Sequence, residues 1–159
     1  EILPYLKWFM DPFEVLEFLM KGRKIDTIIA NSVPNIQRLT GIEEDKIDEE
    51  ALAIYTKGEI YLFSPFKMVA DHLKMTTYEN PKNVLKELGG GNTGVEEKSL
   101  SLYQYERLGL GDYKMITSLL RKWRERTAIN DLIYYIIAAK SMEYAIRKSL
   151  NYAHKNVFN

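Results

Sequence analysis

The sequence predicts an α/β domain in which helices flank a mixed β-sheet, followed by a long C-terminal helix. Through residue 126, short runs of β-branched and aromatic residues alternate with stretches of helical periodicity, as in layered α/β proteins. Two of the strand-like runs are joined by a glycine-containing turn, and the antiparallel hairpin that this predicts makes the sheet mixed. From residue 127, apolar residues recur every three or four positions without proline or glycine, which predicts one uninterrupted helix.

The first predicted helix begins at Pro12. Asp11 can cap it, proline suits the first helical position, and Glu14 stands three residues after the cap. Gly22 is expected to end this helix. Its apolar residues are expected to form one wide buried face: Val15, Leu16, Phe18, Leu19 and Met20.

Residues 27–30 predict a buried strand, because the run Thr-Ile-Ile-Ala is bounded by polar residues and then by Pro34. Residues 51–55 and 59–63 predict a hairpin in which Gly58 supplies the positive φ of the turn. Helices are then predicted at 65–74, 81–88 and 99–108, and strands at 75–78, 95 and 110–115. The last of these helices is expected to turn three residues inward: Leu100, Tyr103 and Leu108.

The predicted C-terminal helix carries an apolar stripe. At 1.5 Å per residue, a helix of up to ~30 residues is roughly 45 Å long, and a small domain cannot cover such a length by itself. The stripe therefore needs a partner, either a second copy or a domain absent from these residues, and a homodimer is predicted. The predicted division is an α/β domain at 1–126 and a helix at 127–159. The stripe consists of Ile129, Leu132, Ile136, Ala139, Met142, Ile146, Leu150, Ala153 and Val157.

Composition excludes several classes of function. The 22 Lys+Arg and 22 Asp+Glu give a formal net charge of zero, which argues against a general nucleic-acid binder or a polybasic membrane protein. The absence of cysteine removes disulfides, thiolate catalysis and cysteine-bound zinc. The longest apolar run, Leu132 to Ala139, is far shorter than the ~20 residues of a membrane helix. No membrane partner and a cytoplasmic location are therefore expected.

Two segments invite a ligand-binding interpretation. Residues 89–94 have the glycine spacing of a phosphate loop, but Val95 and Glu96 stand where lysine and serine or threonine are required, so a helix end and a turn are predicted. An acidic cluster lacks the alternating spacing of a calcium loop, and a solvated loop is favoured over a weak divalent-metal site. The cluster consists of Glu43, Glu44, Asp45, Asp48, Glu49 and Glu50.

The two histidines and one basic run are the remaining residues that could carry chemistry. His72 and His154 have no carboxylate at a metal-motif spacing, and both are expected at the surface. The run Arg121–Arg126 contains Trp123 and could contact nucleic acid, but it is short and includes Glu125. It is expected to lie in a connector that leads into the long helix. No catalytic, cofactor-binding or metal-binding residue is predicted, and no cofactor is expected within these 159 residues.

Several short motifs nevertheless stand in a recognisable order. Asp26-Thr27-Ile28-Ile29, followed by Asn-Ile-Gln-Arg-Leu-Thr-Gly-Ile at 35–42, resembles a strand with the signature Asn-x-x-Tyr-Leu-Thr-Gly-Phe. The hairpin at 51–63 and the Gly-Val-Glu run at 94–96, with the helix after it, also match in place. Residues 120–124 and the helix from Ile129 resemble a Leu-Arg-x-Ile-Lys linker and the helix that follows it. Together these stretches, over most of residues 11–150, resemble the N-terminal domain of the creatinase/prolidase family.

The sequence departs from the family pattern at several positions. Gln37 and Arg38 replace the usual arginine and tyrosine of the first motif. Arg124 stands for the linker lysine, and Ala128 for the glutamate that opens the next helix. Pro65, Lys67 and Met68 replace the aspartate, arginine and tyrosine that often follow the hairpin. A distant or degenerate member would show this pattern.

The resemblance implies a ribonuclease H-like layering of the mixed sheet and a division of labour. Full-length relatives, such as Xaa-Pro dipeptidases and aminopeptidases, carry a catalytic domain in which two aspartates, one histidine and two glutamates hold two divalent metal ions. None of those ligands can be matched here. The resemblance thus implies that peptide substrate and metal are reached only through a catalytic domain of the same chain.

The function predicted is therefore that of a non-catalytic N-terminal domain of a Xaa-Pro dipeptidase- or aminopeptidase-like metallopeptidase, which contributes dimerisation and walls the substrate cleft. An alternative is a free-standing creatinase-like module for binding or assembly, without peptidase activity. A third possibility, an RNA- or small-ligand-binding domain that uses Arg121–Arg126, is less favoured.

Overall fold

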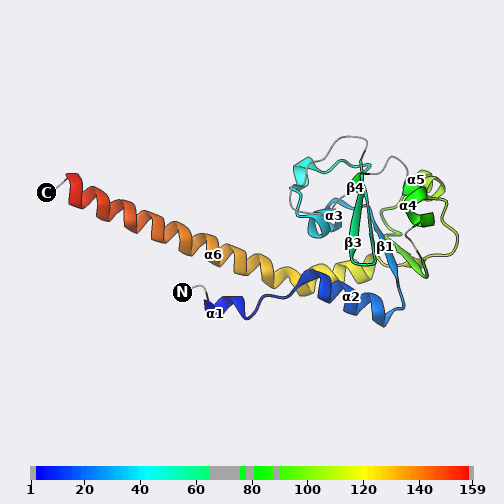
Figure 1. Ribbon diagram of the computed structural model, residues 1–159, viewed down its shortest axis with the longest axis horizontal. Coiled ribbons are helices and arrows are strands. Elements are labelled where there is room, and N and C mark those ends of the chain that lie inside the picture. The colour runs from blue at the N-terminus through cyan, green and yellow to red at the C-terminus, as the bar shows by residue number, and fades with distance from the viewer. Residues whose placement is uncertain (1–2, 65–75, 78–80, 88–89, 158–159) are drawn as a thin grey trace.

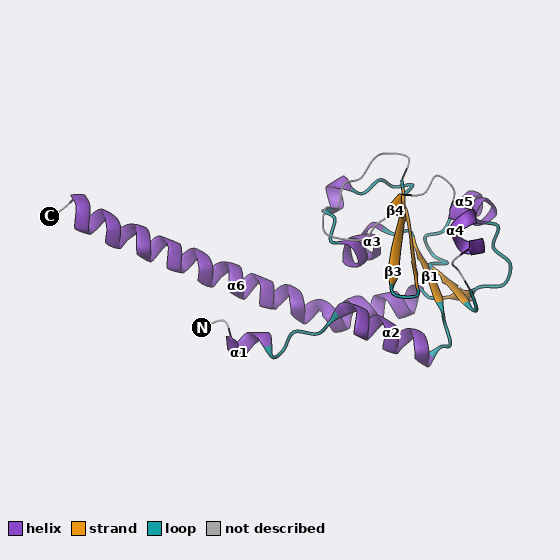
Figure 2. Ribbon diagram, in the orientation of Figure 1, coloured by secondary structure: helices purple, strands orange, loops and turns teal. Residues whose placement is uncertain are grey.

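The computed structural model of the protein describes residues 3–64, 76–77, 81–87 and 90–157. Within them, six strands form one sheet, and helices lie on both of its faces (Figures 1 and 2). The strands are β1 (Thr27–Ala30), β2 (Leu52–Thr56), β3 (Glu59–Phe63), β4 (Thr76–Thr77), β5 (Thr93–Val95) and β6 (Lys114–Met115). The helices are α1 (Leu3–Leu6), α2 (Pro12–Gly22), α3 (Val33–Thr40), α4 (Pro81–Glu87), α5 (Leu102–Leu108) and α6 (Thr117–Val157), with a 3₁₀ turn, η1, at Glu44–Lys46.

The sheet is mixed, as predicted. Its strand order is β4-β3-β2-β1-β5-β6, and β2 is antiparallel to both of its neighbours. The pairs β3–β4, β1–β5 and β5–β6 are parallel, so β2 runs against the other described strands. In the hairpin, Leu52 pairs with Phe63 and Thr56 with Glu59, and Gly58 adopts a φ of 76° in the turn.

One face of the sheet carries the larger core. Because successive strand residues point to opposite faces, Ile28 and Ala30 enter this core while Ile29 enters the other. The larger core lies under α2, α3 and the first part of α6, which contribute Leu16, Ile36 and Trp123 among others. The opposite face, with Ile29, Ile54 and Val95, is covered by α4 and α5 through Val84 and Leu108. The result is a three-layer α/β/α arrangement.

Helix α6 belongs to the domain over its first part only. Its Trp123 is fully buried, and the indole Nε1–H donates to the carbonyl of Pro12 at 2.7 Å. The side chain of Asn130 accepts from the backbone N–H of Met10 at 2.9 Å and donates to its carbonyl at 2.6 Å. Among the described residues of α6, Ile133 is the last buried one and Ile136 and Ile137 are half-buried; beyond them the helix extends away from the domain as a rod (Figure 1).

Most predicted elements are confirmed. The helix at Pro12–Gly22, the strand at Thr27–Ala30 and the hairpin lie where expected, and β4, α4, β5 and β6 fall at or within one or two residues of the segments predicted for them. The helix predicted at 65–74 lies outside the described residues, as does His72.

Five details of the prediction are wrong. The helix predicted at 99–108 begins only at Leu102, after the N-cap Ser101. The long helix begins at Thr117, ten residues before residue 127, so the run Arg121–Arg126 lies inside it and not in a connector. Helix α3 was not predicted, because Pro34 was interpreted as the end of a strand. Pro34 instead occupies the first turn of α3, a position that proline tolerates. Tyr103 is 71% exposed and Phe18 is 68% exposed, so neither faces the core.

Candidate functional site

Two of the resemblance motifs, β1 and the Gly-Val-Glu run, lie side by side where the parallel strands β1 and β5 end. Glu96, directly after β5, is only 1% exposed. Its Oε1 accepts hydrogen bonds from the backbone N–H groups of Asn31 at 3.1 Å and Ser32 at 3.2 Å, the two residues that precede α3. The carboxylate therefore satisfies backbone donors at the beginning of a helix, which is a structural role.

Asn31 extends this network to the other side of the sheet. Its Nδ2 donates to the carbonyl of Ser99 at 2.7 Å and to Oε1 of Gln104 at 3.4 Å. Gln104 also accepts from the backbone N–H of Ser101, whose hydroxyl oxygen accepts from the Gln104 N–H, which makes a capping box at the start of α5. The end of β1, the end of β5 and α5 are thus held by one set of polar contacts.

Glu97 performs a similar task for α6. Its Oε2 accepts from the backbone N–H of Thr117 at 3.0 Å and from the Thr117 hydroxyl at 2.8 Å. Partial burial alone would raise the pKa of the Glu97 carboxyl, but the hydrogen bonds from Thr117 and nearby backbone groups outweigh it, so the pKa lies below its ordinary value. The ionised carboxylate stabilises the first turn of α6.

The motif at 35–42 forms most of α3 and its C-terminal cap. Gly41 takes a left-handed φ of 73° and donates its N–H to the carbonyl of Gln37 at 2.8 Å. Arg38 forms two hydrogen bonds to the carboxylate of Asp131 on α6, at 2.8 and 2.9 Å. This part of the motif therefore fixes α6 against the domain.

The glycine-rich stretch forms a turn, and hydrogen bonds to Asp26 and Lys24 hold it in place. The Asp26 carboxylate accepts from the backbone N–H of Asn92 at 2.8 Å, and a Cβ at Gly91 would clash with that same carboxylate. Asn92 Nδ2 donates to the carbonyl of Lys24 at 2.8 Å. A negatively charged side chain thus occupies the space beside the turn, where a phosphate would be repelled.

The acidic cluster is a solvent-exposed loop around η1, as favoured from the sequence. Lys46 pairs with Glu43 at 3.3 Å, and Asp48 accepts from the backbone N–H of Glu50 at 2.8 Å. Within the described part of the chain, no three histidine, aspartate or glutamate side chains are grouped so that they could hold a metal ion. His154 is exposed near the end of α6.

Two open grooves flank α2 on the surface. The acidic groove, with a volume of about 800 Å³, is lined by Phe13, Glu14, Glu17, Phe18, Lys21, Tyr55, Gly58, Glu59 and Ile60. Burial, followed by the hydrogen bond to Glu17 and the negative charge there, raises the pKa of the Tyr55 hydroxyl. That hydroxyl therefore stays protonated and donates to Glu17 at 2.6 Å.

The basic groove lies between α2 and α6 and has a volume of about 750 Å³. It contains Arg121, Lys122 and Arg126 of the basic run for which nucleic-acid binding was considered from the sequence. Trp123, however, is buried in the core and cannot stack on a nucleic-acid base. The basic groove is lined by Phe18, Leu19, Lys21, Gly22, Arg23, Ser118, Leu119, Arg121, Lys122, Glu125 and Arg126.

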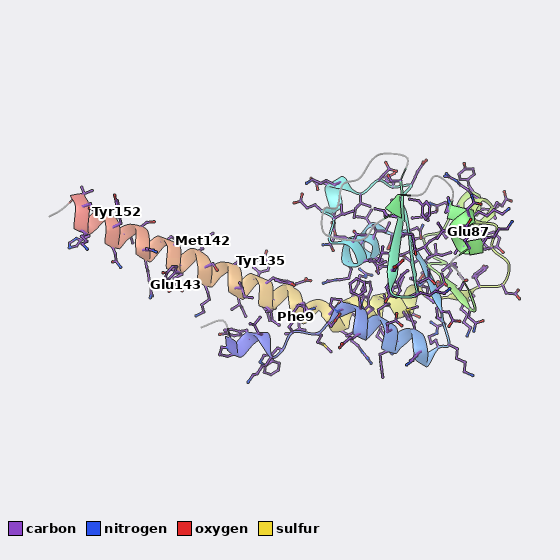
Figure 3. The ribbon with its side chains drawn as sticks, viewed as in Figure 1. Phe9, Glu87, Tyr135, Met142, Glu143 and Tyr152 are labelled. Carbon is purple, nitrogen blue, oxygen red and sulfur yellow. The ribbon has the colours of Figure 1, made fainter. Side chains whose placement is uncertain are left out.

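The apolar stripe is exposed over the protruding part of α6. Met142 is 66% exposed, and Met142 and Tyr152 project from the part of α6 beyond the N-terminal segment, where no other element is drawn beside the helix (Figure 3). At 3.6 residues per turn, the stripe lies roughly 150° around the helix from the buried residues of its first part, such as Trp123 and Ile133. The two apolar faces of α6 therefore point to opposite sides.

Several solved structures have a fold similar to that of this chain. The N-terminal domain of an X-Pro dipeptidase from Streptococcus pyogenes aligns with a TM-score of 0.54 at 17% identity, over 70% of this chain and 99% of that one. Aminopeptidase P from Streptococcus thermophilus aligns with a TM-score of 0.54 at 16% identity, over 71% and 95%. A proline dipeptidase from Streptococcus pneumoniae aligns with a TM-score of 0.52 at 18% identity, over 73% and 98%.

The described residues thus form a three-layer α/β domain in which β2 runs against the other strands. The matched structures show that this is the fold of the creatinase/prolidase N-terminal domain, so the fold implied by the resemblance is confirmed. The chain spans about a third of the length of two longer structures that it matches, a prolidase from Pyrococcus horikoshii and a Xaa-Pro dipeptidase from Bacillus anthracis. No protein-family profile and no curated protein matches the sequence. No helix in the described residues is both long and apolar enough to cross a membrane.

Proposed function

We propose that this chain is the non-catalytic N-terminal domain of a Xaa-Pro dipeptidase- or aminopeptidase-like metallopeptidase, and that it acts in the cytoplasm as a self-associating wall of the substrate cleft. The observation that carries this proposal is α6. Its first part is integrated into the domain by Trp123, Asn130 and the Arg38–Asp131 pair, while its second part presents an uncovered stripe on the opposite side. A helix with this division is suited to join one domain to another.

The charges of the protruding part favour a different domain over a second copy as the cover of the stripe. Beyond Ile133, four basic side chains, Lys140, Arg147, Lys148 and Lys155, stand against the single acidic Glu143. Two copies of this segment laid together would bring like charges close, which opposes association. A catalytic domain with an acidic, apolar groove would meet no such repulsion. Peptide substrate and the two divalent metal ions would belong to that domain.

The test compares the 159-residue chain with the longest product of the same reading frame. Both are assayed on Xaa-Pro dipeptides and on peptides with proline in second position, with manganese or cobalt added. We expect turnover only from the longer product. Turnover by the 159-residue chain alone would overturn the division of labour, and a longer product without metal-dependent activity would favour the free-standing assembly module.

The role of the stripe is tested in the longer product. Ile146→Glu and Leu150→Glu place a charge within the stripe and are expected to lower activity at least about tenfold, because a charge left in an apolar interface separates the domains. Ser141→Glu adds the same charge on the other side of α6 and serves as the matched control. Equal activities in all three variants would contradict the proposed contact.

A further inference from the structure

The outer face of α2 carries an exposed aromatic side chain between two charged ones. Glu14, Phe18 and Lys21 are spaced i, i+4 and i+7, so they share one face of the helix, and all three are exposed. Phe18 is 68% exposed although it occupies the middle of a helix whose other face is fully buried at Leu16. The guanidinium of Arg126, 5.9 Å from the ring centre, lies over Phe18.

The ridge formed by Phe18 and Lys21 separates the acidic groove from the basic groove, since both residues line both grooves. Apart from the shared Lys21, the charged groups among the described residues that line the acidic groove are carboxylates, those of Glu14, Glu17 and Glu59. The basic groove instead contains four further cations against the single Glu125: Arg23, Arg121, Lys122 and Arg126. Although the formal net charge of the chain is zero, negative charges gather on one side of the exposed Phe18 ring and positive charges on the other.

We propose that this surface, the face of α2 with its two grooves, binds the same surface of a second copy. The two copies would be related by a two-fold axis that lies in the contact plane beside Phe18. This axis is perpendicular to the line from the acidic groove to the basic groove. It therefore places each acidic groove over the partner's basic groove. The same axis brings the two Phe18 rings together at the centre. Such a contact is self-complementary in charge and has an aromatic anchor at its middle.

This surface specifies the self-association included in the proposed function and rests on that part of it. It also separates two uses of the molecule: α2 would bind the second copy, and the stripe on α6 would bind the rest of the chain. The test below measures only the oligomeric state of the 159-residue chain, so its failure is distinguishable from a failure of the peptidase assignment.

The experiment uses sedimentation velocity over a range of protein concentrations. Glu14→Lys reverses a charge in the acidic groove and Lys122→Glu reverses one in the basic groove; both side chains are exposed. Each variant alone brings like charges together across the axis, and we expect the dimer Kd to rise at least about tenfold. Mixing the two variants in equal amounts restores both opposite-charge contacts, so dimers should return.

Two further variants sharpen the test. Phe18→Ala should also give monomers, with an unchanged melting temperature because the ring lies outside the core. Glu106→Lys and Lys86→Glu make the same charge changes on α5 and α4, over the opposite face of the sheet, and should leave the dimer intact. A wild-type chain that stays monomeric, variants that dimerise like the wild type, or a mixture that stays monomeric would each overturn the proposed surface.

Discussion

At the residue scale, one glycine of the sheet is closely packed against a buried side chain. Gly94 lies in β5 between β1 and β6, and a Cβ built on it would stand 2.5 Å from Cγ2 of Ile116, which is fully buried. The glycine of the Gly-Val-Glu motif is therefore explained by close packing of β5 against the residue that leads into α6.

We expect Gly94→Ala to destabilise the domain by about 1–3 kcal/mol, because the added methyl group forces the buried Ile116 to move. The free energy of unfolding in urea measures this. Gly111→Ala is the matched control, since nothing lies within 4 Å of a Cβ there. In an Ile116→Ala background, the cost of Gly94→Ala should become smaller. An equal cost in both backgrounds would contradict this explanation.

The carboxyl of Glu97 makes a pH-dependent contribution of predictable sign. Its pKa in the folded chain is lower than in the unfolded chain, so the stability that it adds is present above the unfolded pKa. That stability is lost as the pH falls through the folded pKa. We therefore expect Glu97→Gln to be less stable than the wild type near neutral pH, and the difference between them to shrink with acidification.

Chemical unfolding at a series of pH values from 7 down to about 3 measures this difference. Thr117→Val, which deletes only the hydroxyl donor to Glu97, should reduce the same pH dependence in part. A difference between wild type and Glu97→Gln that stays constant over this range would show that the carboxylate does not stabilise α6 through its charge.

At the element scale, the sequence predicted strands and helix caps more reliably than it predicted which residues face the core. The hairpin and the helix at Pro12–Gly22 follow from local signals, a turn glycine and a capping aspartate before proline, and both are confirmed. The missed helix α3 carries the same kind of signal, with Ser32 at its N-cap, Pro34 in its first turn and Gly41 at its C-cap. That signal could have identified it.

The first ten residues of α6 were missed for a different reason. Residues 121–126 are all charged except Trp123, and this charged run suggested a connector. Leu119, Leu120 and Trp123 nevertheless follow helical spacing, and all three are buried against α2 and the sheet. Glu97, which caps this helix, lies twenty residues earlier in the chain, so its contact could not be predicted from the local sequence.

The same limit applies to the candidate surfaces. The pattern Glu14, Phe18 and Lys21 could be seen as a helical face, but an aromatic residue in an amphipathic helix is more often buried. Only the tertiary structure places Arg121 and Lys122 of α6 beside α2 and so creates the basic groove. The network of Asn31, Glu96 and Gln104 likewise depends on strand order, which the motifs alone do not fix.

At the scale of the whole molecule, α6 combines two roles in one continuous helix. The predicted division at residue 126/127 falls within its packed part, because Asn130 and Ile133 are still buried and Asp131 still pairs with Arg38. After Ile133, Ile136 and Ile137 are still half-buried, and the next four residues are exposed. We therefore expect the α/β domain to require the packed part of the helix and to gain little stability from the part after Ala138.

Two shortened chains test this division. A chain that ends after Ala138 loses only the protruding part, and we expect its free energy of unfolding to stay within about 0.5 kcal/mol of that of the full chain. A chain that ends after Thr127 also loses the buried Ile133, the hydrogen bonds of Asn130 to Met10 and the Asp131 pair. It should be destabilised by at least about 3 kcal/mol, since removal of a buried isoleucine alone costs about 2–5 kcal/mol. Urea unfolding followed by tryptophan fluorescence reports on both, because Trp123 is retained. Strong destabilisation of the longer of the two chains would mean that the rod supports its own domain, and the stripe would then lose its assignment as a contact for another.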